Sequence, residues 1–74
     1  MRTVVAGNID RAIRAKGLTN RQVGEAIGTT EHQVWRWRRA RIKPSDQSLV
    51  ALAGVLTDGD VFQFYIEHDA EAAA

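Results

Sequence analysis

The fold is decided by residues 18–37, LTNRQVGEAIGTTEHQVWRW. This stretch contains one helix-start signal twice: Thr19 precedes Gln22 by three residues, and Thr30 precedes Gln33 by three. In a capping box, the threonine hydroxyl accepts a hydrogen bond from the backbone N–H three residues on, and the glutamine side chain bonds back to the threonine N–H. The pattern predicts two short helices that begin directly after the two threonines.

Gly28 ends the first of these helices and leaves a turn of three or four residues before the second. Such a turn needs a left-handed backbone conformation, which glycine adopts without steric cost. Gly24 is small where the two helices would approach closely, and Val34 and Trp37 fall on the inward side of the second helix. Residues 20–39 therefore have the spacing of a helix-turn-helix.

Helical apolar patterns continue on both sides of this unit. They predict further helices over residues 3–15, 45–56 and 61–68. Residues 69–74 are expected to be a frayed end or the beginning of a linker. No stretch alternates apolar and polar residues as a strand does, so we expect an all-α fold of five helices in a single domain, 1–74. The expected core residues are Leu18, Val23, Ile27, Val34, Trp37, Leu49, Leu52 and Leu56.

Charge is divided sharply along the chain, although the net charge is only +1. Residues 1–43 contain all ten Lys and Arg residues and three acidic ones, whereas residues 44–74 contain six acidic residues and no Lys or Arg. The densest basic run is WRWRRARIK, residues 35–43, with five positive charges. A split of this kind favours a basic face directed at a polyanion, with an idle solvated face as the alternative.

Composition argues against an enzyme or a membrane protein. At 74 residues the chain can bury one small core, and it has no cysteine for a disulfide or a thiolate metal site. It has no apolar run long enough for a membrane span or a signal peptide. No Ser/His/Asp set, pair of carboxylates, phosphate-binding loop or metal-ligand cluster stands out. We therefore expect a cytoplasmic protein that is not an enzyme and has no cofactor, metal or small-molecule substrate.

Four parts of the sequence resemble a known family. Residues 18–30, VWRW at 34–37, KPS at 43–45 and LVALAGVL at 49–56 are similar to Cro/C1-type helix-turn-helix domains, the phage-repressor class of bacterial DNA-binding domains. The similarity covers about residues 5–68. It implies a compact, five-helix, lambda-repressor-like fold whose third helix enters the major groove of double-stranded DNA.

The sequence departs from the family pattern at the end of the third helix. Members usually have Glu-Arg-Gly after the tryptophan, where this chain has Arg38, Arg39 and Ala40. The family's glutamate often pairs with an arginine of the first helix, and the matching position here is Ile13. We therefore expect the interhelical pair to be lost. Because alanine disfavours the left-handed conformation, we also expect the third helix to run on to Arg41 or to end without that cap.

The resemblance implies that five residues at the recognition helix, about residues 30–39, face base edges: Thr30, Glu31, His32, Arg36 and Arg39. Arginine can bind guanine O6 and N7 with two hydrogen bonds, glutamate can accept from cytosine N4, and histidine can donate to guanine N7. A threonine methyl can contact a thymine methyl. The alternative for Glu31 is a role in the first turn of the helix, where a negative charge suits the helix dipole.

Contacts to the DNA backbone are expected from the beginning of the second helix and from the basic run: Asn20, Arg21, Trp35, Arg38, Arg41 and Lys43. Helix N-termini and cationic side chains favour phosphate, and such contacts position a protein without reading sequence. For Trp35, packing against a neighbouring helix is an equal alternative.

The acidic half contains more large apolar side chains than one short helix can bury: Phe62, Phe64, Tyr65 and Ile66. An exposed apolar patch often marks a partner surface, and domains of the resembled family commonly dimerise through this end. A homodimer through the fifth helix is one expectation, and capping of the core by Val61, Phe62 and Tyr65 is the other.

Two functions from different classes follow from these patterns. The arginine-rich face favours a sequence-specific DNA-binding transcriptional regulator, either a phage-type repressor or a Cro-like protein, with operator DNA as its partner. The alternative is an antitoxin-like protein-interaction module that uses the same fold.

Overall fold

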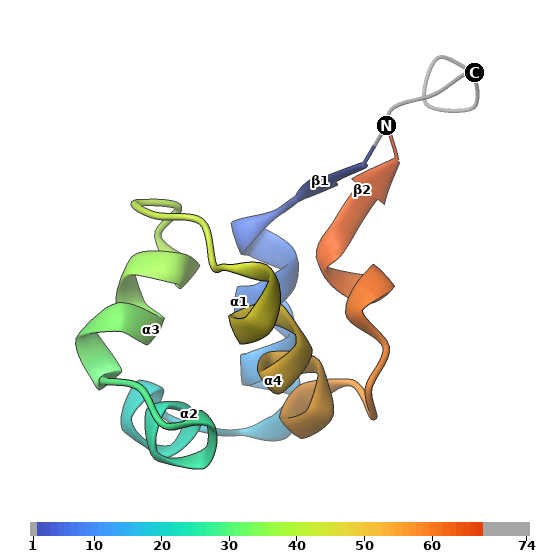
Figure 1. Ribbon diagram of the computed structural model, residues 1–74. Coiled ribbons are helices and arrows are strands. Elements are labelled where there is room, and N and C mark those ends of the chain that lie inside the picture. The colour runs from blue at the N-terminus through green and yellow to red at the C-terminus, as the bar shows by residue number, and fades with distance from the viewer. Residues whose placement is uncertain (1, 68–74) are drawn as a thin grey trace.

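Helices α1 to α4 make up most of the computed structural model, which describes residues 2–67. In chain order the elements are β1 (Arg2–Val4), α1 (Ala6–Lys16), α2 (Asn20–Ile27), α3 (Glu31–Arg38), α4 (Asp46–Leu56), the 3₁₀-helix η1 (Val61–Phe64) and β2 (Tyr65–Glu67). In Figure 1, α2 and α3 lie at the opposite end of the molecule from the β1–β2 ribbon. The prediction of a mostly helical domain is confirmed.

The two helices of the predicted helix-turn-helix begin where their caps place them. Thr19 Oγ1 accepts a hydrogen bond from the Gln22 N–H at 3.1 Å, and Gln22 Oε1 accepts one from the Thr19 N–H at 2.8 Å. Thr30 Oγ1 accepts from the Gln33 N–H at 3.1 Å. Gly28 follows α2 in the left-handed conformation, with φ of 80°. Local signals thus determine both ends of α2 and the beginning of α3.

The two outer ends of the fold correct the sequence-based prediction. The first helix begins at Ala6 instead of residue 3, and the predicted fifth helix is one turn of 3₁₀-helix followed by a strand. β1 and β2 pair antiparallel, with Val4 opposite Tyr65, so the expectation of a fold without strands is wrong in this detail. β-branched and aromatic residues suit a strand once a partner is available, and here the partner comes from the other end of the chain.

Some of the predicted features lie outside the described residues. These are the last residue of the predicted fifth helix and the whole tail, residues 69–74. Among residues 2–67, no helix combines the length and the apolar content that crossing a membrane would require.

One core joins α1, α2, α3, α4 and η1. Its buried members are Ile9, Ile13, Val23, Val34, Trp37, Leu49, Leu52, Ala53, Leu56 and Phe64. Two predicted members, Leu18 and Ile27, are only partly buried and pack at its margin. Because Val34 and Trp37 point into this core, the opposite side of α3 is left exposed.

Candidate nucleic-acid interface

The angle between α2 and α3 is fixed by backbone packing at Gly24. A Cβ atom added to Gly24 would lie 2.7 Å from the Thr29 carbonyl oxygen and 3.1 Å from the Thr30 carbonyl carbon. The Thr29 N–H also donates to the Gly24 carbonyl at 2.8 Å. No side chain fits between these backbone segments, so α3 is held directly against α2, and the orientation of its exposed side is set by the turn.

The exposed side of α3 carries the residues that were expected to face bases. Glu31, His32 and Arg36 are exposed on α3, and Arg39 is exposed directly after it. His32, Arg36 and Arg39 are spaced by four and three residues, which places them on one side of a helix. Thr30 precedes them as the N-cap, and its hydroxyl already accepts the Gln33 N–H.

The end of α3 differs from the sequence-based expectation. The helix ends at Arg38, and Ala40 adopts the left-handed conformation with φ of 58°. The Arg41 N–H donates to the Arg36 carbonyl at 2.9 Å, and the Ala40 N–H donates to the Trp37 carbonyl at 3.3 Å. These two bonds are the hydrogen-bond pattern of a Schellman motif. The motif is therefore present with alanine at its left-handed position, and the chain reverses there.

Trp35 carries three side chains around its ring. The imidazole of His32 is stacked with the indole, with ring centroids 5.5 Å apart and planes inclined by 12°. The guanidinium carbons of Arg39 and Arg41 lie 5.8 Å and 6.0 Å from the ring centroid. The sequence placed Trp35 on the DNA side or against a helix, but it did not predict this cluster.

Arg38 connects three helices instead of extending into solvent. Its Nε lies 2.6 Å from Asp10 Oδ1 on α1, and its Nη1 donates to Asn20 Oδ1 on α2 at 2.6 Å. Arg14 completes the group, with its Nε 2.8 Å from Asp10 Oδ2. The side chain of Arg38 is 17% exposed.

This network corrects the expectation that the pair between the first and third helices is lost. The pair is present with its signs reversed, because Arg38 stands at the family's glutamate position and Asp10 lies one turn before Ile13 on α1. Partial desolvation raises the pKa of Asp10, but the hydrogen bond and charge of Arg38, followed by those of Arg14, lower it below its usual value. The carboxylate is therefore held in its charged form.

The other residues that were expected to contact the DNA backbone lie in different surroundings. Arg21 is exposed on α2, with its Nε 3.6 Å from a carboxylate oxygen of Glu25. Asn20 is half-buried, and its side-chain oxygen accepts a hydrogen bond from Arg38. Arg41 is exposed beside Trp35.

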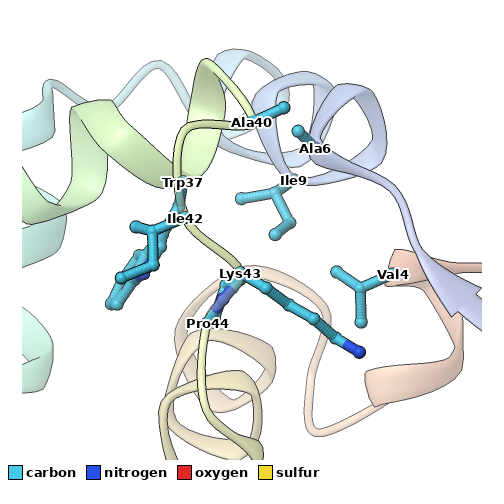
Figure 2. Close-up of a pocket in the computed structure, with 8 residues that line it drawn as sticks. All are labelled: Val4, Ala6, Ile9, Trp37, Ala40, Ile42, Lys43 and Pro44. Carbon is cyan, nitrogen blue, oxygen red and sulfur yellow. The ribbon is translucent and has the colours of Figure 1, made fainter.

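Lys43 lies in a different place from the cluster on α3. It lines a hollow of about 180 Å³ between the beginning of the chain and the loop after α3. Figure 2 shows its side chain extending across this hollow toward Val4, with Ile42 and Ala40 also at the hollow. Lys43 is therefore not grouped with the arginines around Trp35.

A second hollow, of about 410 Å³, adjoins the exposed side of α3. It is lined by Asp10, Arg14, Asn20, Trp35, Arg38 and Arg39. Asp10 and Arg14 were not singled out from the sequence. The available signal was the reversed charge at Arg38, which favours an acidic partner on the first helix but does not say which residue it is.

Arg36, Arg39, Arg41 and Lys43 have no salt bridge to an acidic side chain among residues 2–67. Their positive charges are therefore available at the surface that contains α3 and the loop after it. No group of three His, Cys, Asp or Glu side chains in the described part of the chain is arranged to hold a metal ion.

Comparison with solved structures identifies the architecture. No protein-family model and no curated protein matches the sequence. The structure is similar to the crystal structure of the P22 c2 repressor protein in complex with a synthetic operator, with a TM-score of 0.75. The match covers 84% of this chain and 92% of the repressor chain, at 16% sequence identity. The fold is that of a phage-repressor-type helix-turn-helix domain. In this repressor-type fold, α2 and α3 form the helix-turn-helix.

Proposed function

We propose that this chain binds double-stranded DNA in a sequence-specific manner by placing α3 in the major groove, and that it regulates transcription as a phage-type repressor or Cro-like protein. The observation that carries the proposal is the exposed side of α3, where His32, Arg36 and Arg39 lie together. The fold supports it, because a structure with the same architecture was solved as a repressor bound to a synthetic operator. Such a regulator acts in the cytoplasm of a bacterial or phage-infected cell.

Base reading is assigned to the exposed residues at and after the beginning of α3. Arg36 binds a guanine through O6 and N7, and His32 donates to a neighbouring guanine N7. Glu31 accepts from a cytosine N4, and Thr30 offers its methyl group to a thymine. Arg39 lies at the margin of this side, within reach of a base edge or of the adjacent phosphate.

Phosphate contacts are assigned first to Arg41, which lies beyond the helix end, and then to Arg21 and Lys43. Each is exposed, and phosphate contacts fix the register of the protein on the duplex. Arg38 and Asn20 contribute mainly by holding α3 against α1 and α2. Arg38 is hydrogen-bonded to Asp10 on α1 and to Asn20 on α2.

Selection of bound duplexes from a random pool tests the proposal and yields the site. With that site in hand, Arg36→Ala should weaken specific binding by about 1–3 kcal/mol and relax the preference at one base pair. Arg41→Ala should weaken binding to all duplexes by similar factors. It should also reduce the slope of log K against log salt by roughly one unit, since each neutralised phosphate releases about 0.9 of a counterion.

Arg11→Ala is the matched control. Arg11 carries the same charge but lies on α1 beside Asn8 and lines a separate hollow with Gln63, away from α3. Its removal should change affinity much less than either of the other substitutions. Failure to recover any enriched duplex would refute the DNA-binding proposal, and equal losses on specific and unrelated DNA for Arg36→Ala would move base reading away from Arg36.

We further propose weak self-association through the segment that contains η1. Phe62 is 61% exposed there and supports this surface, whereas Phe64 is fully buried and Tyr65 is half-buried, so these two belong mainly to the core. The expected interface is therefore smaller than the sequence suggested, and for Ile66 only the backbone pairing in β2 is described. Analytical ultracentrifugation with and without a selected duplex tests it. One protein per site at saturation would rule out a symmetric dimer.

The same exposed Phe62 is the feature that favours the antitoxin-like alternative, in which the main partner is another protein. One substitution distinguishes the two functions. If the chain is a DNA-binding regulator, Phe62→Ser should leave unchanged its affinity for a duplex that binds a single protein molecule. Loss of binding to a protein partner, with no selectable duplex, would support the alternative.

A further inference from the structure

We propose that Trp35 is a positioning residue that holds the guanidinium groups of Arg39 and Arg41 in place before DNA arrives. It acts through these arginines and not through a contact of its own with the duplex. The inference rests on the proposed DNA-binding function and assigns a division of labour within the same surface.

The geometry around the indole ring is the first support. Arg39 and Arg41 place their guanidinium carbons 5.8 Å and 6.0 Å from the ring centroid. A cation within about 6 Å of an aromatic centroid is attracted by the ring quadrupole, and the indole of tryptophan is the strongest partner. His32 is stacked on the same ring. Three side chains thus lie around the indole, although Trp35 keeps 36% of its surface exposed.

The backbone supplies the second support, because it brings Arg41 to the ring. Arg39 follows Trp35 by four residues, a spacing at which side chains on a helix meet. Arg41 would leave along the helix axis if α3 simply continued. Instead, Ala40 turns the chain in the left-handed conformation, and the Arg41 N–H is fixed on the Arg36 carbonyl at 2.9 Å. The turn places the Arg41 backbone, and the ring then orders its side chain.

The physical consequence is pre-organisation. Arginine has a long side chain with many rotamers, and ordering it on binding opposes association. Two guanidinium groups that are already held near one ring lose less freedom when they bind phosphates. Arg36 provides the contrast, since it is adjacent to Trp35 in sequence but makes no ring contact among the described residues.

The first arm of the test uses the free protein. Ring currents from Trp35 should shift the δ-methylene protons of Arg39 and Arg41 upfield in the NMR spectrum, and Trp35→Leu should return both to ordinary positions. The δ-protons of Arg36 are the internal control and should not move. Ordinary shifts for Arg39 and Arg41 in the wild-type protein would overturn the proposal without any DNA measurement.

The second arm is a double-mutant cycle on an unrelated duplex. Trp35→Leu should weaken binding about tenfold in the wild-type background, as expected if two arginine side chains must then be ordered on binding. It should have less than about a twofold effect where Arg39 and Arg41 are both alanine. Trp35→Phe should retain most of the affinity, because phenylalanine keeps a π-face. Thermal melting checks that each variant is folded.

The outcomes separate the two proposals. In one outcome, the wild-type protein binds DNA and Trp35→Leu lowers the affinity by the same factor in the wild-type background and in the background where Arg39 and Arg41 are alanine. In that case Trp35 contacts DNA directly, and its positioning role is refuted while the proposed function stands. If the wild-type protein binds no duplex, the proposed function fails and the role assigned to Trp35 fails with it.

Discussion

Replacing Ala40 with glycine should stabilise the protein, because the turn after α3 holds an alanine where glycine is preferred. Ala40 has φ of 58°, and the left-handed conformation costs an L-residue about 1–2 kcal/mol. Glycine avoids this penalty but gains freedom in the unfolded chain, which offsets about 0.4–1 kcal/mol. The Ala40 side chain is exposed, so little apolar burial is lost. The free energy of unfolding should therefore rise by about 0.5–1 kcal/mol.

For a domain of this size, 1 kcal/mol corresponds to a change in Tm of about 4–8 °C, so Ala40→Gly should raise Tm by several degrees. Thermal melting followed by circular dichroism at 222 nm measures the shift, and urea denaturation gives the free energy independently. The variant should also keep the cation–π distances around Trp35, because glycine preserves the same turn.

Two substitutions serve as matched controls. Gly28→Ala makes the reverse change at a left-handed position with φ of 80°, where an added Cβ has no other heavy atom within 4 Å. It should destabilise the fold through conformation alone. Ala51→Gly makes the same change inside α4 and should cost about 1 kcal/mol, because glycine is unfavourable in a helix. If Ala40→Gly lowered Tm as Ala51→Gly does, Ala40 would not be left-handed and the description of the α3 end would be wrong.

Three further predictions concern the core, the turn and the network on Arg38. Gly24→Ala should lower the free energy of unfolding by about 1–3 kcal/mol, because the new Cβ would lie 2.7 Å from a carbonyl oxygen. Urea denaturation measures this loss. A variant that is more stable, as the better helix propensity of alanine alone would predict, would contradict it. Trp37→Ala should cost about 3–5 kcal/mol, since the side chain is 2% exposed, and a Tm close to that of the wild type would disprove its place in the core. Asp10 has a lowered pKa, so its contribution to stability is present above its unfolded pKa of about 3.8 and is lost as pH falls through the folded value. Asp10→Asn should therefore flatten the loss of stability in acid, and an unchanged pH profile of the urea midpoint would show that the Arg38 pair contributes nothing.

The sequence by itself determined the central unit and the side of α3 that is exposed. The signals there are local: a threonine and a glutamine three residues apart, a glycine at the turn, and apolar residues at helical spacing. Each acts within one or two turns of backbone, so propensity and capping are enough to place α2 and the beginning of α3. The inward positions of Val34 and Trp37 then assign the exposed positions by elimination.

Only the tertiary structure decided the features that depend on partners distant in sequence. Val4 and Tyr65 form a strand pair because residues 2–4 and 65–67 meet, and that contact overrides the helical pattern over residues 65–67. Arg38 is bonded to Asp10 because α1 and α3 pack side by side, which no spacing rule predicts. Arg41 reaches Trp35 through a local turn, in which Ala40 adopts the left-handed conformation that alanine disfavours and that the sequence therefore did not predict. A reading of local patterns has no access to contacts between segments distant in sequence, and at Ala40 the local preference, of about 1–2 kcal/mol, points to a different conformation.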